Sequence, residues 1–127
     1  MTVVSFRCDS QGGGLSPPIK LRTVNRTFII GRSPECDLVI NNHFISRRHA
    51  ELSMTPTGGV MLRDLGSSNG TGIGSIHNKV QESPVQEMDL VFFSEDYPVP
   101  GGVLIRHFIN WQSSQGRARA SLTLGDV

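Results

Sequence analysis

The sequence predicts an all-β protein, a β-sandwich of two mostly antiparallel sheets. Many short runs of β-branched, aromatic or alternating apolar residues are separated by clusters of Gly, Pro, Asn and Ser. We find no apolar stripe with a helical period over ten or more residues, so we expect no helix. A chain of 127 residues is long enough to bury a core without disulfides.

The first predicted strands lie before residue 41. Val3–Arg7 alternates loosely, and a Gly- and Pro-rich loop follows it. Ile19–Val24 alternates apolar and polar residues, and Thr27–Ile30 is a β-branched and aromatic run that ends at Gly31. Asp37–Ile40 is short and leads into two asparagines, which favour a turn.

The middle of the chain predicts a β-hairpin. Ala50–Met54 alternates, residues 55–59 are a Thr-Pro-Thr-Gly-Gly breaker, and Val60–Leu65 resumes the strand pattern. A weak strand or turn is expected around residues 73–76. Two further strands are predicted later in the chain, at Met88–Phe93 and Val103–Ile109.

We expect one domain over residues 1–111 and a flexible linker or tail over residues 112–127. After Trp111 the chain is polar, small and without pattern, although residues 122–127 could dock back on the domain. This linker-like end leads us to expect that the sequence is a fragment of a longer protein.

Composition excludes several classes of protein. The formal net charge is +1, whereas a general nucleic-acid binder shows a clear basic excess. No apolar stretch approaches the ~20 residues that cross a bilayer, so no membrane partner is expected. The N-terminus lacks the features of a signal peptide, and Cys8 and Cys36 are too few for a disulfide scaffold. We therefore expect an intracellular protein, cytoplasmic or nuclear.

Three short motifs follow one another between predicted strands. They are Gly31-Arg32, Ser46-Arg47-Arg48-His49 and Gly66-Ser-Ser-Asn-Gly-Thr71. The Arg32 guanidinium offers paired donors that match phosphate oxygens. Ser46 adds a hydroxyl, and Arg47 adds a second cation or a backbone N–H. Together these groups could surround one phosphate from two sides.

The third motif suits a peptide main chain. The Asn69 amide has both a donor and an acceptor, as does the backbone of an extended peptide. Gly66 and Gly70 permit the backbone angles of tight loops.

In their order and spacing, these motifs resemble the forkhead-associated (FHA) domain family. The similarity runs from about Phe28 to Phe93. It implies a β-sandwich that includes residues 3–109, with a binding site in the loops at one end. It also implies phosphothreonine-dependent binding of extended phosphopeptides in protein–protein signalling, with no cofactor and no catalysis.

The resemblance also implies a role for each motif residue. Those that match the family's phosphopeptide contacts are Arg32, Ser46, Arg47, Ser68 and Asn69. The first three would contact the phosphate, Ser68 would lie near the phosphothreonine, and Asn69 would hold the peptide main chain. His49 would brace the loop that carries Ser46, and Gly31 and Gly70 would support the site. A small pocket for the threonine methyl group would favour phosphothreonine over phosphoserine.

Two departures from the family pattern affect loop geometry. Residues 72–79 replace an apolar residue and a Val-Asn-Gly turn, and Glu87-Met-Asp89 stands where a Gly-Asp is common. Phe44 is open to two interpretations: an anchor to the core, or a contact for an apolar residue about three positions after the phosphothreonine.

Other functions remain open at this stage. One is a structural FHA-like assembly domain whose binding needs no phosphate. Another is the targeting domain of a larger enzyme. Within these residues Ser46 and His49 lack the third member of a catalytic triad. Cys36, His43 and His49 match no zinc spacing, so no metal is expected. The oligomeric state and the phosphorylated partner are not encoded in these patterns.

Overall fold

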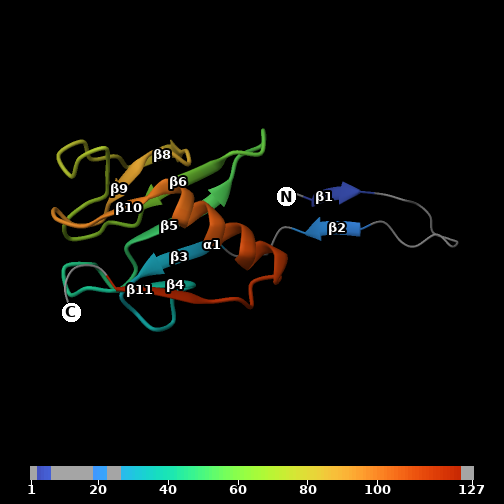
Figure 1. Cartoon of the computed structure of the whole chain (residues 1–127), viewed down its shortest axis with the longest axis horizontal. Coiled ribbons are helices and arrows are strands. Elements are labelled where there is room, and N and C mark those ends of the chain that lie inside the picture. The colour runs from blue at the N-terminus through green and yellow to red at the C-terminus, as the bar shows by residue number, and fades with distance from the viewer. Residues whose placement is uncertain (1–2, 7–18, 23–26, 124–127) are drawn as a thin grey trace, which may run out of the picture.

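The computed structural model describes residues 3–6, 19–22 and 27–123 (Figure 1). Its elements run in the order β1 (Val3–Phe6), β2 (Ile19–Arg22), β3 (Phe28–Gly31), β4 (Leu38–Asn41), β5 (Ala50–Met54), β6 (Val60–Asp64), β7 (Gly72–Ile73), β8 (Glu82–Val85), β9 (Leu90–Phe92), β10 (Pro98–Pro100), α1 (Gly101–Ser113) and β11 (Ala120–Thr123). The predicted all-β class is confirmed, with one helix added to it.

The described strands form two main sheets and a separate hairpin. One sheet has six strands in the order β11-β4-β3-β5-β6-β8, and the other has three in the order β10-β9-β7. Strands β1 and β2 pair antiparallel with each other, in two of the segments predicted as strands. They join neither larger sheet, whereas the family resemblance placed them within the sandwich.

The sequence accounts for the strands at the centre of the larger sheet. All four residues of β3 are buried, as expected for an apolar strand with neighbours on both sides. The predicted β5–β6 hairpin is confirmed, with Ala50 opposite Asp64 and Met54 opposite Val60. Its five-residue turn closes through a bond from the Thr55 N–H to the Gly59 carbonyl, 2.9 Å long.

The strand predicted at Val103–Ile109 is wrong, because this segment lies inside α1. Leu104, Phe108 and Trp111 are spaced four and three residues apart, and all three are buried. Isoleucine and valine between them give the same stretch a β-like composition. The burial of one helical face therefore overrides local strand propensity.

The chain beyond Trp111 also differs from the predicted linker. Residues 112 and 113 complete α1, and β11 then pairs parallel with β4, with Ala120 opposite Leu38. The turn between them is fixed by Ser114, whose Oγ accepts bonds from the N–H groups of Arg117 and Ala118. Docking of the chain end thus occurs through residues 120–123, while residues 124–127 lie outside the described part.

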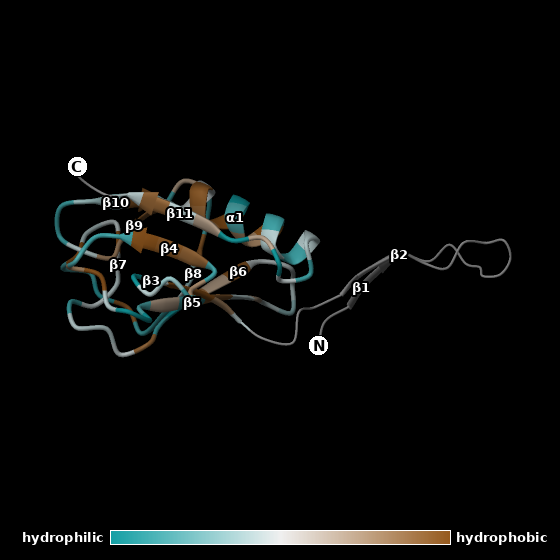
Figure 2. Cartoon of the chain, turned by 90° about the horizontal axis from the view of Figure 1, so that it is seen from below, coloured by the Kyte–Doolittle hydropathy of each residue, from teal (hydrophilic) through white to brown (hydrophobic). Residues whose placement is uncertain are grey.

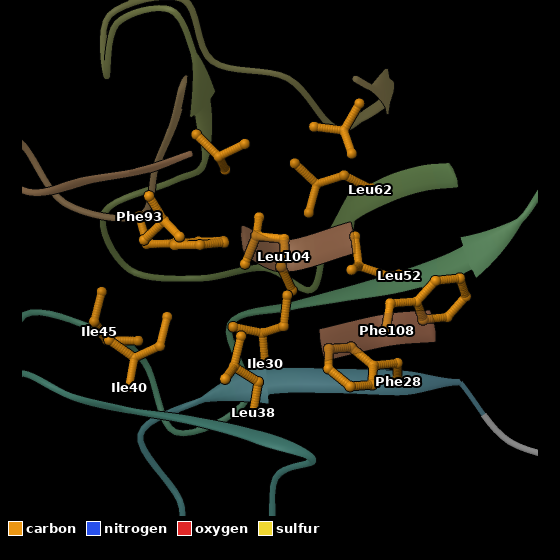
Figure 3. Packing of buried hydrophobic residues seen from close by; sticks show 14 of the residues in the cluster. Phe28, Ile30, Leu38, Ile40, Ile45, Leu52, Leu62, Phe93, Leu104 and Phe108 are labelled. Carbon is orange, nitrogen blue, oxygen red and sulfur yellow. The ribbon is translucent and has the colours of Figure 1, made fainter. Parts of the chain in front are cut away.

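The core lies between the larger sheet, α1 and the smaller sheet. Figure 3 shows side chains of β3, β4 and β5 gathered with Leu104 and Phe108 of α1. The Phe28 ring meets those of Phe108 and Trp111 edge to face, with centroids 5.6 and 5.3 Å apart. Figure 2 shows the hydrophobic character of β4 against hydrophilic loops. No helix in the described residues is long and apolar enough to cross a membrane.

Candidate functional site

Three loops carry the motif residues and are bonded to one another. They are the β3–β4 loop (32–37), the β4–β5 loop (42–49) and the β6–β7 loop (65–71). The first two are joined by backbone bonds from the Arg32 N–H to the Ser46 carbonyl, 2.9 Å, and from the Ser33 N–H to the Arg47 carbonyl, 3.1 Å. Gly31 permits this approach, because a Cβ there would lie 2.2 Å from the Arg47 carbonyl oxygen.

Arg32 is exposed and only partly engaged. Its Nε donates to the Ile45 carbonyl at 3.0 Å, which orients the guanidinium across the β4–β5 loop. The two Nη groups have no hydrogen-bond partner among the described residues. The side chain is therefore held at one edge and keeps a pair of charged donors for an anion.

Ser46 and Ser68 connect the second loop to the third. The Ser46 Oγ accepts a bond from the Ser68 N–H at 2.9 Å, and Ser46 is half-buried while Ser68 is exposed. The Ser46 hydroxyl still has a proton to donate. Arg47 and Arg48 follow Ser46 in the same loop, and both are exposed.

His49 is completely buried and holds both loops. Its Nδ1 accepts a bond from the Ser46 N–H at 3.1 Å, so the proton of the neutral ring lies on Nε2. That Nε2 donates to the Gly70 carbonyl at 2.9 Å, and the ring packs edge to face on Phe93. Burial lowers the pKa of His49, although the Gly70 carbonyl and the Asp64 carboxylate oppose this effect.

These bonds also exclude a catalytic Ser–His pair. His49 uses Nδ1 for the Ser46 backbone and Nε2 for the Gly70 carbonyl, so neither nitrogen serves the Ser46 hydroxyl. Among the residues described here, no group of three or more His, Cys, Asp or Glu side chains could hold a metal ion.

Asn69 spans from the third loop to the second. Its Nδ2 donates to the Phe44 carbonyl at 2.8 Å, and the side chain is exposed. Gly70 follows with a φ of 84°, a left-handed conformation that glycine adopts without strain. Asn69 is thereby fixed at the surface, and its Oδ1 accepts no hydrogen bond from the described residues.

The FHA domain model matches residues 28–93, which include all three motifs and more than half of the chain. The chain belongs to the FHA domain family. FHA domains are phosphothreonine-dependent interaction modules and are in general not enzymes. The resemblance inferred from the motifs is thus confirmed.

Solved FHA structures share the fold. An FHA domain of a Chlamydia trachomatis protein is 26% identical, with a TM-score of 0.50, over 64% of this chain and 80% of that one. The FHA-2 domain of a Mycobacterium tuberculosis ABC transporter is 27% identical, with a TM-score of 0.50, over 75% and 77%. A Synechocystis sp. protein is 27% identical, with a TM-score of 0.52, over 66% and 86%. No curated protein sequence matches the chain significantly.

Asp64 organises the third loop of this FHA domain, and the sequence analysis missed it. Its carboxylate accepts bonds from the N–H groups of Gly66 and Ser67 and from the hydroxyls of Ser67 and Thr71. Burial alone would raise the pKa of Asp64, but these bonds outweigh it and hold the pKa below its usual value. An Asp two residues before a Gly, in a loop rich in Ser, is the sequence pattern that could have revealed this turn.

Phe44 does not anchor its loop in the core. Its side chain is 52% exposed, and its ring lies 4.3 Å from that of His43, centroid to centroid. The first of the two interpretations of Phe44 is therefore wrong. An exposed aromatic pair instead stands beside Asn69 at the edge of the motif surface.

At both places where the sequence departs from the family pattern, local hydrogen bonds close the altered turn. The altered turn at 72–79 is closed by the Asn78 Nδ2, which donates to the Ile73 carbonyl, and by the Val80 N–H, which donates to the Thr71 carbonyl. Asp89 caps the turn before β9 by accepting a bond from the Gln86 N–H at 2.7 Å. Met88, where a Gly is common in the family, is 90% exposed and does not have a left-handed backbone conformation.

Proposed function

We propose that this FHA domain is a phosphothreonine-dependent protein–protein interaction module that binds extended phosphopeptides through its β3–β4, β4–β5 and β6–β7 loops. The observation that carries the proposal is the state of Arg32. Its Nε is hydrogen-bonded to the Ile45 carbonyl, while its Nη groups donate to no acceptor in the described chain. The loop that carries the Ser46 hydroxyl is bonded to the Arg32 backbone.

The proposed phosphate site combines charge with hydrogen-bond donors. A phosphothreonine carries roughly −1.5 to −2 charges near neutral pH and three acceptor oxygens. Arg32 would donate its Nη groups to these oxygens, Ser46 its hydroxyl proton, and Arg47 a guanidinium or a backbone N–H. Each such charge-assisted bond contributes on the order of 1.5–3 kcal/mol.

The peptide backbone would lie along the third loop. Asn69 would bond the main chain through its Oδ1 and through its second Nδ2 hydrogen, because the Phe44 carbonyl engages only one of the two. Ser68 would lie near the phosphothreonine, beside the Ser46 hydroxyl to which its N–H is bonded. A short peptide buries little surface, so we expect affinity near the micromolar level, about −8 kcal/mol.

The proposal places the domain inside the cell, with a phosphorylated protein as its partner and with neither nucleic acid nor membrane as a ligand. It also assigns no catalytic role to these residues. A phosphate-independent assembly domain would not need Arg32, Ser46 and Asn69 on one surface, which is why we prefer the phosphopeptide function.

Fluorescence anisotropy with a degenerate peptide library tests the proposal. The library is fixed at phosphothreonine, with phosphoserine and unphosphorylated threonine libraries beside it. We expect binding to the phosphothreonine library alone, and its loss in Arg32→Ala without a change in thermal unfolding, because the side chain is exposed.

The matched control is Arg106→Ala, which removes an exposed arginine from α1 and should leave binding intact. Retained affinity in Arg32→Ala would refute the phosphate site. Failure of the folded wild-type protein to bind any phosphothreonine peptide would favour the assembly domain instead.

A further inference from the structure

A cavity of about 330 Å³ opens beside Asn69, outside the three phosphate-site positions at Arg32, Ser46 and Arg47. Its walls come from four loops between residues 44 and 96. Phe44 and Asn69 border it from the β4–β5 and β6–β7 loops, and Ile76 and Lys79 border it from the turn after β7. The last wall is the segment after β9, residues 94–96.

Ser94 in this wall carries an unsatisfied polar atom. The residue is only 4% exposed, and its Oγ is buried without a hydrogen-bond partner in the described structure. Almost every buried hydroxyl in a folded protein is paired, so an unpaired one needs an explanation. Ser94 is one of the residues that line the cavity, so a ligand group that reaches its hydroxyl there would supply the missing bond.

The charges around the cavity are unequally distributed. Glu95 and Asp96 follow Ser94, are exposed, and form no ion pair with any described residue. The single lysine of the lining, Lys79, has its aliphatic stem against Gly70, since a Cβ on Gly70 would lie 2.7 Å from the Lys79 Cε. Two carboxylates on the Ser94 wall therefore stand against one ammonium, whose stem is held on the Asn69–Gly70 wall, and one exposed imidazole, that of His77.

The apolar residues of the lining help to identify which kind of ligand side chain the cavity could bind. Phe44 offers an exposed ring, and Ile76 is nearly buried at 9% exposure. Phe44 alone would favour an apolar ligand side chain. Such a side chain, however, would leave the Ser94 hydroxyl unpaired and would desolvate the carboxylates of Glu95 and Asp96. Lysine and arginine combine an aliphatic stem with a cationic end, and arginine also stacks on aromatic rings.

We propose that this cavity takes a lysine or arginine side chain of the phosphorylated ligand, with the stem against Phe44 and Ile76 and the cation at Ser94, Glu95 and Asp96. The inference rests on the proposed function and narrows its substrate class. The domain would then select phosphothreonine sites that have a basic residue on the flank that passes Asn69.

The test uses the full chain and one alanine-rich phosphothreonine peptide. At each flanking position in turn, the peptide carries Arg, Lys, Leu or Glu, and affinity is measured by anisotropy. We expect one position at which Arg or Lys binds about tenfold more tightly than Leu, the effect of one partly desolvated charged contact. Glu at that position should bind least tightly.

Variants assign the preference to the cavity. Glu95→Gln with Asp96→Asn should abolish the preference for Arg over Leu, because it weakens binding of the Arg peptide and removes the cost of desolvating two carboxylates beside Leu. The matched control is Glu82→Gln, an exposed carboxylate on β8, which should change neither affinity.

Ser94→Ala should weaken binding of the Arg peptide about threefold. The same variant should not lower the melting temperature of the free protein, because the lost hydroxyl has no partner.

The possible failures are distinguishable. Phosphothreonine binding with a preference for Leu, or an Arg preference that survives the double substitution, would overturn the basic guest but leave the proposed function intact. An unchanged Arg-peptide affinity in Ser94→Ala would overturn the assignment of Ser94. Absence of all phosphothreonine-dependent binding would overturn this inference together with the proposed function.

Discussion

The motif loops and the C-terminal segment 101–123 are held in place by different kinds of contact. The loops are joined by polar bonds centred on two buried groups, His49 and Asp64. The C-terminal segment is held by apolar packing from Leu104, Phe108 and Trp111, together with the β11–β4 pairing. The first arrangement fixes the direction of polar groups, whereas the second mainly supplies stability.

A buried side-chain bond links the two regions, beside a backbone bond from the Ala120 N–H of β11 to the Asp37 carbonyl, 3.1 Å long. The Trp111 Nε1 donates to the Asp37 Oδ1 at 3.0 Å, and the Asp37 Oδ2 accepts from the Ile29 N–H at 2.9 Å. Asp37 also ends the loop that begins at Arg32. If this bond couples the two regions, substitutions in α1 will weaken phosphopeptide binding as well as stability. If it does not, such substitutions will lower stability alone.

The largest effect is expected from Trp111→Ala. The ring is 2% exposed and packs on Phe28 and Phe108, so its loss should lower the free energy of unfolding by about 4 kcal/mol in urea denaturation. Since this variant could fail to fold, Trp111→Phe separates the two roles of the ring. It keeps most of the apolar surface and removes the donor to Asp37.

For Trp111→Phe we expect a loss of about 2 kcal/mol in stability and phosphopeptide affinity within about threefold of the wild type, if the regions are independent. Leu104→Val, a change in the same helix that does not touch Asp37, is the matched control. If phosphopeptide affinity were much weaker in Trp111→Phe but not in Leu104→Val, the two regions would not be independent. Asp37 would then be the residue that couples them.

The C-terminal segment shows why part of the fold escaped prediction. Leu104, Phe108 and Trp111 do have helical spacing, but Val103, Ile105 and Ile109 fill the positions between them. A short run that is apolar on several sides fits a buried strand as well as a helix. The outcome depended on the face of the β3–β4–β5 sheet that this segment covers, which is tertiary information absent from the local pattern.

The second-largest effect is expected from His49→Ala. The change leaves the Ser46 N–H and the Gly70 carbonyl without their partner, and it removes a buried ring that packs on Phe93. We expect a loss of about 3 kcal/mol in the free energy of unfolding. We also expect at least about tenfold weaker phosphopeptide binding, because the loops that carry Ser46 and Asn69 loosen.

Calorimetric melting and anisotropy check this prediction together. The control is His107→Ala, which removes a half-buried histidine from α1 and should leave affinity unchanged. Unchanged melting in His49→Ala would mean that the ring does not hold the loops together.

Asp64→Asn should have a smaller effect of the same kind. The amide keeps one acceptor oxygen and loses the charge, and the Ser67 and Thr71 hydroxyls can turn to accept from its NH₂ group. We expect a loss of about 1.5 kcal/mol in denaturant unfolding and a severalfold loss of affinity. Glu82→Gln, which neutralises an exposed carboxylate on β8, should leave stability and affinity unchanged; equal losses in both variants would contradict the role of Asp64.

Asp64 also marks the limit of prediction at the site. Arg32, Ser46, Asn69 and His49 stand in motifs whose side-chain chemistry is visible in the sequence, and the structure brings them onto adjoining loops. The Asp-x-Gly pattern at Asp64 indicates the local bond to the Gly66 N–H, but the bonds from the Ser67 and Thr71 hydroxyls become apparent only when the loop at 66–71 folds back on it. The unpaired Ser94 hydroxyl likewise depends on packing rather than on sequence.

The smallest effect we expect is a pH dependence of stability that His49 dominates. Its pKa is lowered in the folded protein, so the unfolded chain takes up a proton at a pH where the native ring stays neutral. The free energy of unfolding should therefore fall as the pH drops below about 6.5, the ordinary value for histidine. Asp64 acts in a separate window: its lowered pKa stabilises the fold above about 3.9, and that contribution disappears at lower pH.

Urea denaturation of the peptide-free protein measures this dependence without the phosphate, which takes up its own second proton near pH 6. The pKa of His107 is also lowered, by burial and by the neighbouring Arg106, so its contribution has the same sign. Because His49 is fully buried and His107 only half-buried, His107→Gln should keep most of the slope. A slope that vanishes in His107→Gln would assign the proton linkage to α1, and the polar bonds of the motif loops would then contribute little to it.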